Sequence, residues 1–134
     1  MELFTEDGKR NVNIGNSETW HSVYSTLMVR TGGFVRKVPY AVEFFKSAGC
    51  GSERSLETAR QINLVRDKLS NYSPEEAVYD MNDRGKRAPW EGNISPVVTS
   101  CANLYTTADG KDLLFEIVSI LTYGAYMKTD VCVR

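Results

Sequence analysis

A long amphipathic segment in the middle of the chain is the feature that most constrains the fold. From position 52 onward, apolar side chains recur every three or four residues, the spacing that places them on one face of an α-helix. Most of the charged side chains between them fall on the remaining faces, toward solvent. We therefore expect a helix over residues 52–69 whose buried face consists of Leu56, Ala59, Ile62, Val65 and Leu69.

Two shorter helices are expected before this segment. The first follows the capping sequence Gly15-Asn16-Ser17, keeps its apolar residues on one face and ends near Arg30. The second begins at Pro39, where the missing amide costs nothing in the first turn of a helix, and ends at the glycines of positions 49 and 51.

A strongly apolar helix is expected near the end of the chain. Asp109 can act as its N-cap, and Asp112, three residues later, can return the hydrogen bond in the manner of a capping box. The buried stripe expected for this helix is Leu114, Ile117, Val118, Leu121 and Ala125.

The remaining signals are those of short strands and loops. Residues 3–5 and 12–14 flank the turn-forming sequence Asp7-Gly8-Lys9, which predicts a hairpin. A single turn at residues 73–76 is expected to lead into a strand at 77–81, and residues 129–133 alternate like a closing strand. Residues 104–107 have a strand-like composition, whereas residues 97–104 are ambiguous between helix and strand. Residues 82–95 carry glycine, proline and charge without periodicity, which indicates a long ordered loop.

Strands and helices interspersed around one core predict an α+β fold. We expect a small, mostly antiparallel sheet packed against helices, in a single domain over residues 1–134. A doubly wound nucleotide-binding fold is disfavoured, because Gly32-Gly33-Phe34 lacks the glycine spacing that surrounds a phosphate with backbone amides.

Composition excludes several classes of function. The formal net charge is −1, whereas a nucleic-acid-binding protein usually carries a basic stripe, so direct nucleic-acid binding is disfavoured. The sequence has no apolar run long enough to cross a membrane and begins without the features of a secretory signal, which favours the cytoplasm. Its three cysteines are widely separated and form no CxxC pair, so we expect reduced, mostly buried thiols and neither a metal site nor a cofactor.

Catalytic residue patterns are weak. His21 is the only histidine and is expected at the surface or at the boundary of the core. No base or cationic residue lies in the sequence around Cys101, so packing in the core is its expected role. A small hydrolase that pairs carboxylates remains an alternative, although a solvated acidic face is the favoured interpretation of these residues, which are Glu75, Glu76, Asp80 and Asp83.

The same acids have a second possible use in binding another protein. Between positions 71 and 83 there are four acids and no base, and three cations follow at once, at positions 84, 86 and 87. Such a local separation of charge can steer a protein partner. Tyr79 and Trp90 are residue types that often anchor interfaces, although Trp90 can equally be a plug that pins its loop to the core.

The last third of the chain resembles a known family. The similarity is carried by Pro89-Trp90 with Asn93-Ile94-Ser95, by Asn103-Leu104-Tyr105, and by the run from Thr107 to Leu113. These motifs resemble the bacterial immunity protein family seventy of polymorphic toxin systems. The resemblance implies a cytoplasmic protein of the contact-dependent growth inhibition type that is not an enzyme and that binds a cognate toxin domain, often a nuclease such as an RNase.

On this hypothesis, the protein blocks the active or substrate-binding site of the toxin domain, which would form the C-terminal part of a large secreted toxin. An acidic surface with an aromatic anchor could lie where the nucleic acid would otherwise bind. The residues expected to bind the partner are Tyr79, Asp80, Asp83, Trp90 and Glu91. The sequence leaves open the oligomeric state and the alternative of a homo-oligomeric structural or regulatory module.

Overall fold

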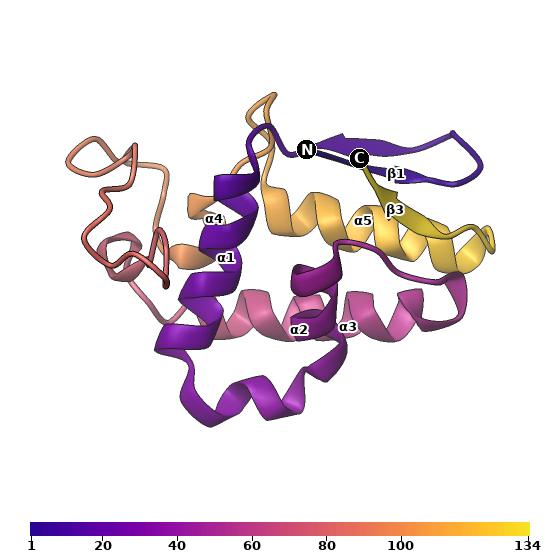
Figure 1. The fold of residues 1–134 in the computed structure, drawn as a ribbon, viewed down its shortest axis with the longest axis horizontal. Helices are drawn as coiled ribbons and strands as arrows, with labels where there is room; N and C mark the ends of the chain where they lie inside the picture. The colour runs from indigo at the N-terminus through magenta and orange to yellow at the C-terminus, as the bar shows by residue number, and fades with distance from the viewer.

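The computed structural model describes all of residues 1–134, and it confirms the α+β fold (Figure 1). The elements in chain order are β1 Glu2–Thr5, β2 Asn11–Asn13, α1 Ser17–Arg30, the 3-10 helix η1 Gly32–Lys37, α2 Pro39–Ser47, α3 Ser52–Leu69, the 3-10 helix η2 Pro74–Glu76, α4 Cys101–Leu104, α5 Leu113–Tyr126 and β3 Val131–Val133. None of the helices has the length and hydropathy needed to span a membrane.

The sheet joins the two ends of the chain. Its order is β2-β1-β3, and both pairings of the central strand β1 are antiparallel. The predicted hairpin is therefore confirmed, and the closing strand pairs with β1, so that the termini lie side by side (Figure 1). The backbone groups of Glu2 and Arg134 exchange hydrogen bonds, and the Arg134 guanidinium also donates to the Glu2 carboxylate at 2.6 Å. The small sheet is thus held together by contacts between the two ends of the sequence.

Helices α3 and α5 pack side by side, with α5 between α3 and the sheet (Figure 1). They run in opposite directions, since Arg66 near the end of α3 lies over the ring of Phe115 at the start of α5, at 5.6 Å. At the other end of the pair, Leu56 and Tyr126 line the same shallow hollow. The close approach of the chain that leaves α5 requires Gly124, because a Cβ there would lie 2.8 Å from the carbonyl oxygen of Thr129.

Aromatic side chains fix α1 against α2. The ring of Trp20 meets the rings of Phe44 and Phe45 at centroid distances of 5.4 and 5.1 Å. The indole N–H donates to the backbone carbonyl of Phe45 at 2.8 Å, so its one polar group is satisfied within the core. This contact orients α1, whose opposite face supports the segment described below.

Two details of the expected helix faces are wrong. Leu56 is 53% exposed, because it lies six residues from the buried Ile62 and therefore about 120° around the helix. Ser55 and Thr58 are buried on α3 in its place. In α5 the buried side extends to Leu113, Ile120 and Gly124, whereas Val118 and Ala125 are only half-buried, since both the sheet and α3 contact this helix.

The cap of α5 also differs from the expectation. The helix begins at Leu113, and the Asp112 carboxylate accepts from the amide of Phe115 at 3.1 Å, so Asp112 is the N-cap. Asp109 instead accepts from the hydroxyl of Thr107 within a turn that precedes the helix. The chain reverses direction in that turn at Gly110, whose φ of 85° lies in the left-handed region that favours glycine.

Two expected strands are absent. Residues 77–81 are extended in part but pair with no strand, because hydroxyl groups of α1 bond their backbone instead. Leu104 ends a short helix, α4, and residues 105–107 contribute only the isolated bridge between Thr106 and Asp112. The ambiguous stretch 97–104 is a loop followed by α4, whose first turn is capped by Ser100.

Candidate functional site

A long irregular segment forms one end of the molecule. Residues 77–100 contain no helix or strand, and the segment lies beside α1, at the opposite end from the turn that joins β1 to β2 (Figure 1). Backbone hydrogen bonds inside it are mostly local turns, such as Asp83 to Asp80 and Glu91 to Ala88. Its conformation must therefore be held by contacts with the rest of the protein.

Hydroxyl groups of α1 take the place of a partner strand. The amide of Val78 donates to Thr26 Oγ1 at 2.8 Å, and its carbonyl accepts from Ser22 Oγ at 2.9 Å. Three residues further along the segment, the amide of Met81 donates to Ser25 Oγ, also on α1, at 3.1 Å. Since a buried backbone group without a partner is costly, these three side chains fix where the segment starts.

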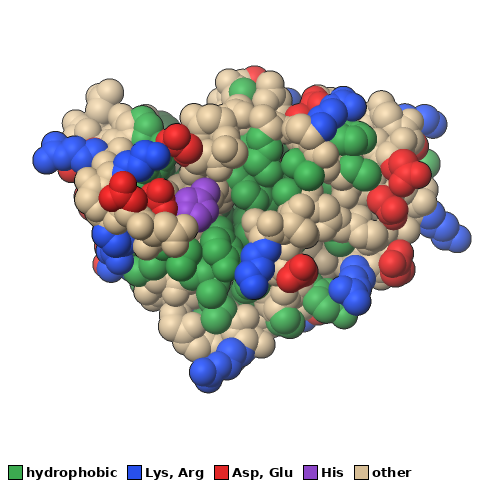
Figure 2. Space-filling view, viewed as in Figure 1, with side chains coloured by type: hydrophobic (Ala, Val, Ile, Leu, Met, Phe, Trp, Pro, Cys, Tyr) green, Lys and Arg blue, Asp and Glu red, His purple; other side chains and the backbone are tan.

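A hydrogen-bonding contact with His21 of α1 holds Asp80 of the segment. His21 Nε2 lies 3.0 Å from Asp80 Oδ1, and the same oxygen accepts from the amide of Asn82 at 2.9 Å. The Asn82 amide, followed by His21, lowers the pKa of Asp80 below its ordinary value. The histidine side chain is 37% exposed, so the expectation of a boundary position is confirmed. Figure 2 shows this single histidine beside acidic and basic side chains at the loop end of the molecule.

Tyr79 points into the protein and not toward solvent. It is 8% exposed, and its hydroxyl donates to the carboxylate of Glu18 on α1. This hydrogen bond, aided by burial, raises the pKa of Tyr79 to about 12. Lys86 joins the same group, with its ammonium 3.6 Å from Glu18 Oε1 and 5.6 Å from the centre of the Tyr79 ring. Tyr79 therefore anchors the segment to α1.

Trp90 pins the middle of the segment. Its ring forms T-shaped contacts with two tyrosines, with a centroid distance of 5.5 Å and an interplanar angle of 84° to Tyr79, and 5.8 Å and 90° to Tyr105. Tyr105 is itself buried, and its hydroxyl lies 2.8 Å from Thr26 Oγ1. The indole is half-buried, so the interpretation of Trp90 as a plug is supported, while part of the ring still reaches solvent.

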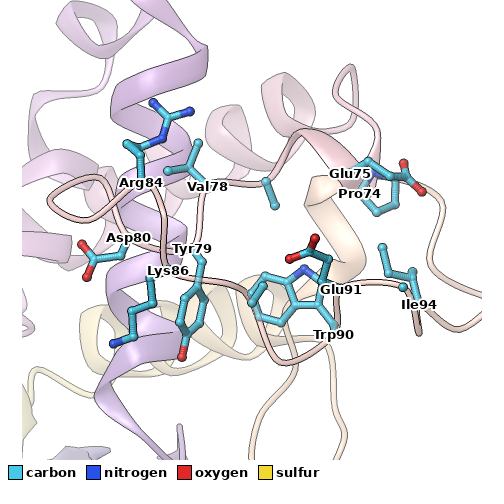
Figure 3. Close-up of a pocket in the computed structure, with 13 residues that line it drawn as sticks. Pro74, Glu75, Val78, Tyr79, Asp80, Arg84, Lys86, Trp90, Glu91 and Ile94 are labelled. Carbon is cyan, nitrogen blue, oxygen red and sulfur yellow. The ribbon is translucent and has the colours of Figure 1, made fainter.

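A cavity of about 370 Å³ is lined by residues from the stretches 74–80 and 84–94. Figure 3 shows Glu91 beside the indole of Trp90, with Glu75 at one end of the group and Arg84 and Lys86 at the other. Glu75 and Glu91 take part in no ion pair within the protein, whereas Lys86 is paired with Glu18. The end of the hollow near Trp90 is therefore aromatic and acidic.

Four of the five residues proposed from the sequence line this one cavity, namely Tyr79, Asp80, Trp90 and Glu91. Asp83 does not line the cavity. It lies in an exposed turn, in which its own backbone amide donates to the carbonyl of Asp80 at 3.2 Å. Sequence reasoning missed Glu18, Ser22 and Thr26, which hold the segment from about 50 to 60 positions away. Their spacing of four residues on one face of α1, away from the apolar stripe, is the signal that could have found them.

Two of the four carboxylates considered for a hydrolase are engaged in other contacts. Glu76 turns back to accept from the amide of Ser73 at 2.9 Å, in a capping box. Asp80 has a lowered pKa, the opposite of what a general acid requires. Cys101 is buried, and burial raises the pKa of its thiol to about 11, which favours packing over nucleophilic attack. The structure shows no group of three or more His, Cys, Asp or Glu side chains that could hold a metal ion.

Comparison with known families decides the class of the protein. The family model described as immunity protein 70 matches residues 4–133. The chain belongs to this family. The resemblance found in the last third of the sequence is thus confirmed, and it extends across the N-terminal half. No curated protein and no solved structure matches the chain.

Membership in the immunity protein 70 family makes the chain an immunity protein of a polymorphic toxin system, with a cognate toxin protein as its partner. Nothing in the cavity beside Trp90 contradicts a binding role, since its walls combine apolar side chains with three charged groups that have no ion-pair partner within the protein, namely Glu75, Glu91 and Arg84. An immunity protein acts through its surface, so the question becomes which face meets the toxin.

Proposed function

We propose that the protein neutralises its toxin by covering the active or substrate-binding site with the irregular segment beside α1. We define the loop surface by five residues: Asp83, Glu91 and the open part of Trp90 are exposed, and Tyr79 and Asp80 support them from the inner side. The proposal rests on one observation: hydroxyl groups of α1 hydrogen-bond to the backbone of this segment, which has no helix or strand of its own, and hold it in place. Segments held rigid in this way bind with little loss of conformational entropy.

The five residues divide into contacting and supporting side chains. Asp83 and Glu91 are exposed and would meet the toxin directly, together with the open part of Trp90. Tyr79 and Asp80 are engaged with Glu18 and His21, so their part is to hold the surface in shape. A fixed pattern of charge around a partly buried aromatic ring is a common form of interface centre.

We infer a nuclease as the toxin class from the exposed carboxylates of Asp83 and Glu91, which lie beside the exposed cations Arg84 and Arg87 in the sequence. The catalytic groove of a nuclease is lined by cations that bind phosphate, and exposed carboxylates around Trp90 would occupy the same cations. Binding of this kind weakens as salt concentration rises, because exposed charges are screened. We further propose that the protein acts in the cytoplasm, against a toxin domain delivered by contact between cells.

The proposal can be tested with a cognate toxin domain, for which a toxin gene adjacent to the gene of this protein would be the candidate. The two proteins are expressed together, co-purified, and assayed for cleavage of RNA and DNA with and without the immunity protein. We expect a stable complex without nuclease activity, and a loss of growth when the immunity protein is omitted. An active toxin within the complex would contradict occlusion, and cleavage of neither nucleic acid by the free toxin would contradict the nuclease assignment.

A further inference from the structure

The outer part of the irregular segment is joined to the rest of the protein by very few contacts. We call residues 83–96 the strap. No hydrogen bond joins the strap to a helix or strand, because its backbone bonds are short turns, such as the one from the amide of Asn93 to the carbonyl of Trp90. Segments whose backbone bonds only to itself and to water open at a low cost in free energy. The strap therefore depends on its side chains to stay in place.

Only one side chain of the strap reaches the hydrophobic core. None of the strap residues is buried, and the half-buried ones are Ala88, Trp90 and Ile94. Of these three, Trp90 alone packs against the core. Its ring contacts the rings of Tyr79 and Tyr105, as described above. The indole is therefore the one apolar attachment of the strap to the core.

A single ion pair is the second attachment of the strap. The Lys86 ammonium lies 3.6 Å from Glu18 Oε1, and both side chains are about half-exposed. Exposed pairs of this kind contribute little, because water and salt screen the two charges. The other cations of the strap, Arg84 and Arg87, form no ion pair. Trp90 is thus the main attachment.

The chain on either side of the strap is held much more firmly. Before it, Val78 and Tyr79 are buried, and the amide and carbonyl of Val78 are bonded to hydroxyl groups of α1. After it, the carbonyl of Val97 accepts from the side-chain amide of Asn103 on α4 at 3.1 Å. A weakly attached stretch between two firmly attached ones can open as one unit, without unfolding its neighbours.

We infer that the strap is a lid that opens as one unit while the rest of the protein stays folded, and that Trp90 is its latch. In the closed state the indole contacts the rings of Tyr79 and Tyr105. Opening withdraws the indole from both rings and carries Glu91 away from Asp80, which stays with α1. The loop surface is therefore complete only when the strap is closed.

Trypsin provides the test on the full chain, because the strap contains three of its cleavage sites, after Arg84, Lys86 and Arg87. Proteolysis tracks the population of the open form when closing is faster than cleavage. We expect trypsin to cut the folded wild-type chain first in the strap. Trp90→Ala should raise the initial rate of this cut about tenfold or more, and Trp90→Phe, which keeps a ring, should raise it less.

The toxin gives a separate readout, which rests on the proposed function. Toxin bound to the loop surface would hold Trp90 and Glu91 in the closed position, so cleavage of the strap should slow about tenfold or more at saturation. Bound toxin that leaves this rate unchanged would contradict the loop surface as the toxin site, whereas the variants of Trp90 would still establish the lid.

Two controls separate opening of the strap from unfolding of the whole protein. Lys9 and Arg10 are exposed in the turn between β1 and β2, where the backbone of Arg10 is bonded to Thr5, so they should be cut far more slowly than the strap. Val65→Ala weakens the buried face of α3 and should leave the rate of strap cleavage within about twofold. Circular dichroism verifies the fold of each variant, and Trp90→Phe serves alone if Trp90→Ala unfolds. An unchanged rate in the Trp90 variants, or equal acceleration by Val65→Ala, overturns the inference.

Discussion

The ring of Trp90 meets the buried ring of Tyr105 edge to face, with centroids 5.8 Å apart and ring planes at 90°. This contact joins the irregular segment to the core, because Tyr105 bonds in turn to Ser22 and Thr26 on α1. The irregular segment and the supporting helix therefore form one connected unit, and the contact can be tested residue by residue.

Trp90→Ala should lower the free energy of unfolding by about 2 to 3 kcal/mol, somewhat less than the loss of a fully buried tryptophan, because the indole is only half-buried. Trp90→Phe, which keeps an aromatic ring, should cost less. Urea denaturation measures both variants. A change below about 0.5 kcal/mol for the alanine variant would show that the ring does not pin the loop.

Thr26→Val removes the hydroxyl that accepts from the amide of Val78. The buried amide would lose its partner, so we expect a destabilisation of about 1 to 3 kcal/mol and faster hydrogen exchange at Val78. Thr58→Val is the control, since that hydroxyl bonds the carbonyl of Arg54 within its own helix and should not affect exchange at Val78. Equal exchange rates at Val78 in both variants would contradict the proposed role of α1.

Alkaline pH should destabilise the fold through Tyr105. Its burial raises its pKa from 10.0 to about 12, so the folded state retains the proton where the unfolded state has lost it. The stabilisation is complete below pH 10 and is lost as pH rises toward 12, an effect of up to about 3 kcal/mol. Denaturation curves between pH 9 and 12 measure the fall, which should be shallower in Tyr105→Phe. Identical slopes in the two proteins would disprove this assignment.

Asp112→Ala should fray the first turn of α5, because the Asp112 carboxylate accepts from the amide of Phe115. The expected cost is about 1 kcal/mol, with faster hydrogen exchange at that amide. Asp109→Ala should leave exchange at Phe115 unchanged, since Asp109 bonds Thr107 in the preceding turn. The opposite pattern would restore Asp109 as the cap.

The elements that the sequence predicted correctly are those with a local signal. The positions of α1, α2 and α3 follow from caps, from Pro39 and from apolar spacing, and the hairpin follows from its central turn. The prediction of a strand at residues 77–81 was wrong. Alternation of apolar and polar residues indicates which side chains are buried, but it does not indicate which groups hydrogen-bond to the backbone. Thr26 and Ser22 supply those bonds from about 50 residues away.

The candidate site shows the same limit. Composition singled out Tyr79, Trp90 and the nearby acids, and the structure brings four of the five proposed residues around one cavity. It also turns Tyr79 inward, toward Glu18. The four-residue spacing of Glu18, Ser22 and Thr26 marks a polar face of α1, but it does not reveal that Glu18 pairs with Tyr79, since these two residues are 61 positions apart in the sequence.

The central claim is that the loop surface binds the toxin, and calorimetric titration of the purified toxin domain with two double variants tests it most directly. Asp83→Ala/Glu91→Ala removes two exposed carboxylates from the loop surface, whereas Glu43→Ala/Asp67→Ala removes two from other faces. We expect the first pair to weaken binding about tenfold or more, most strongly at low salt, and the second to leave the affinity within about twofold. Equal affinities for the two double variants would contradict the account.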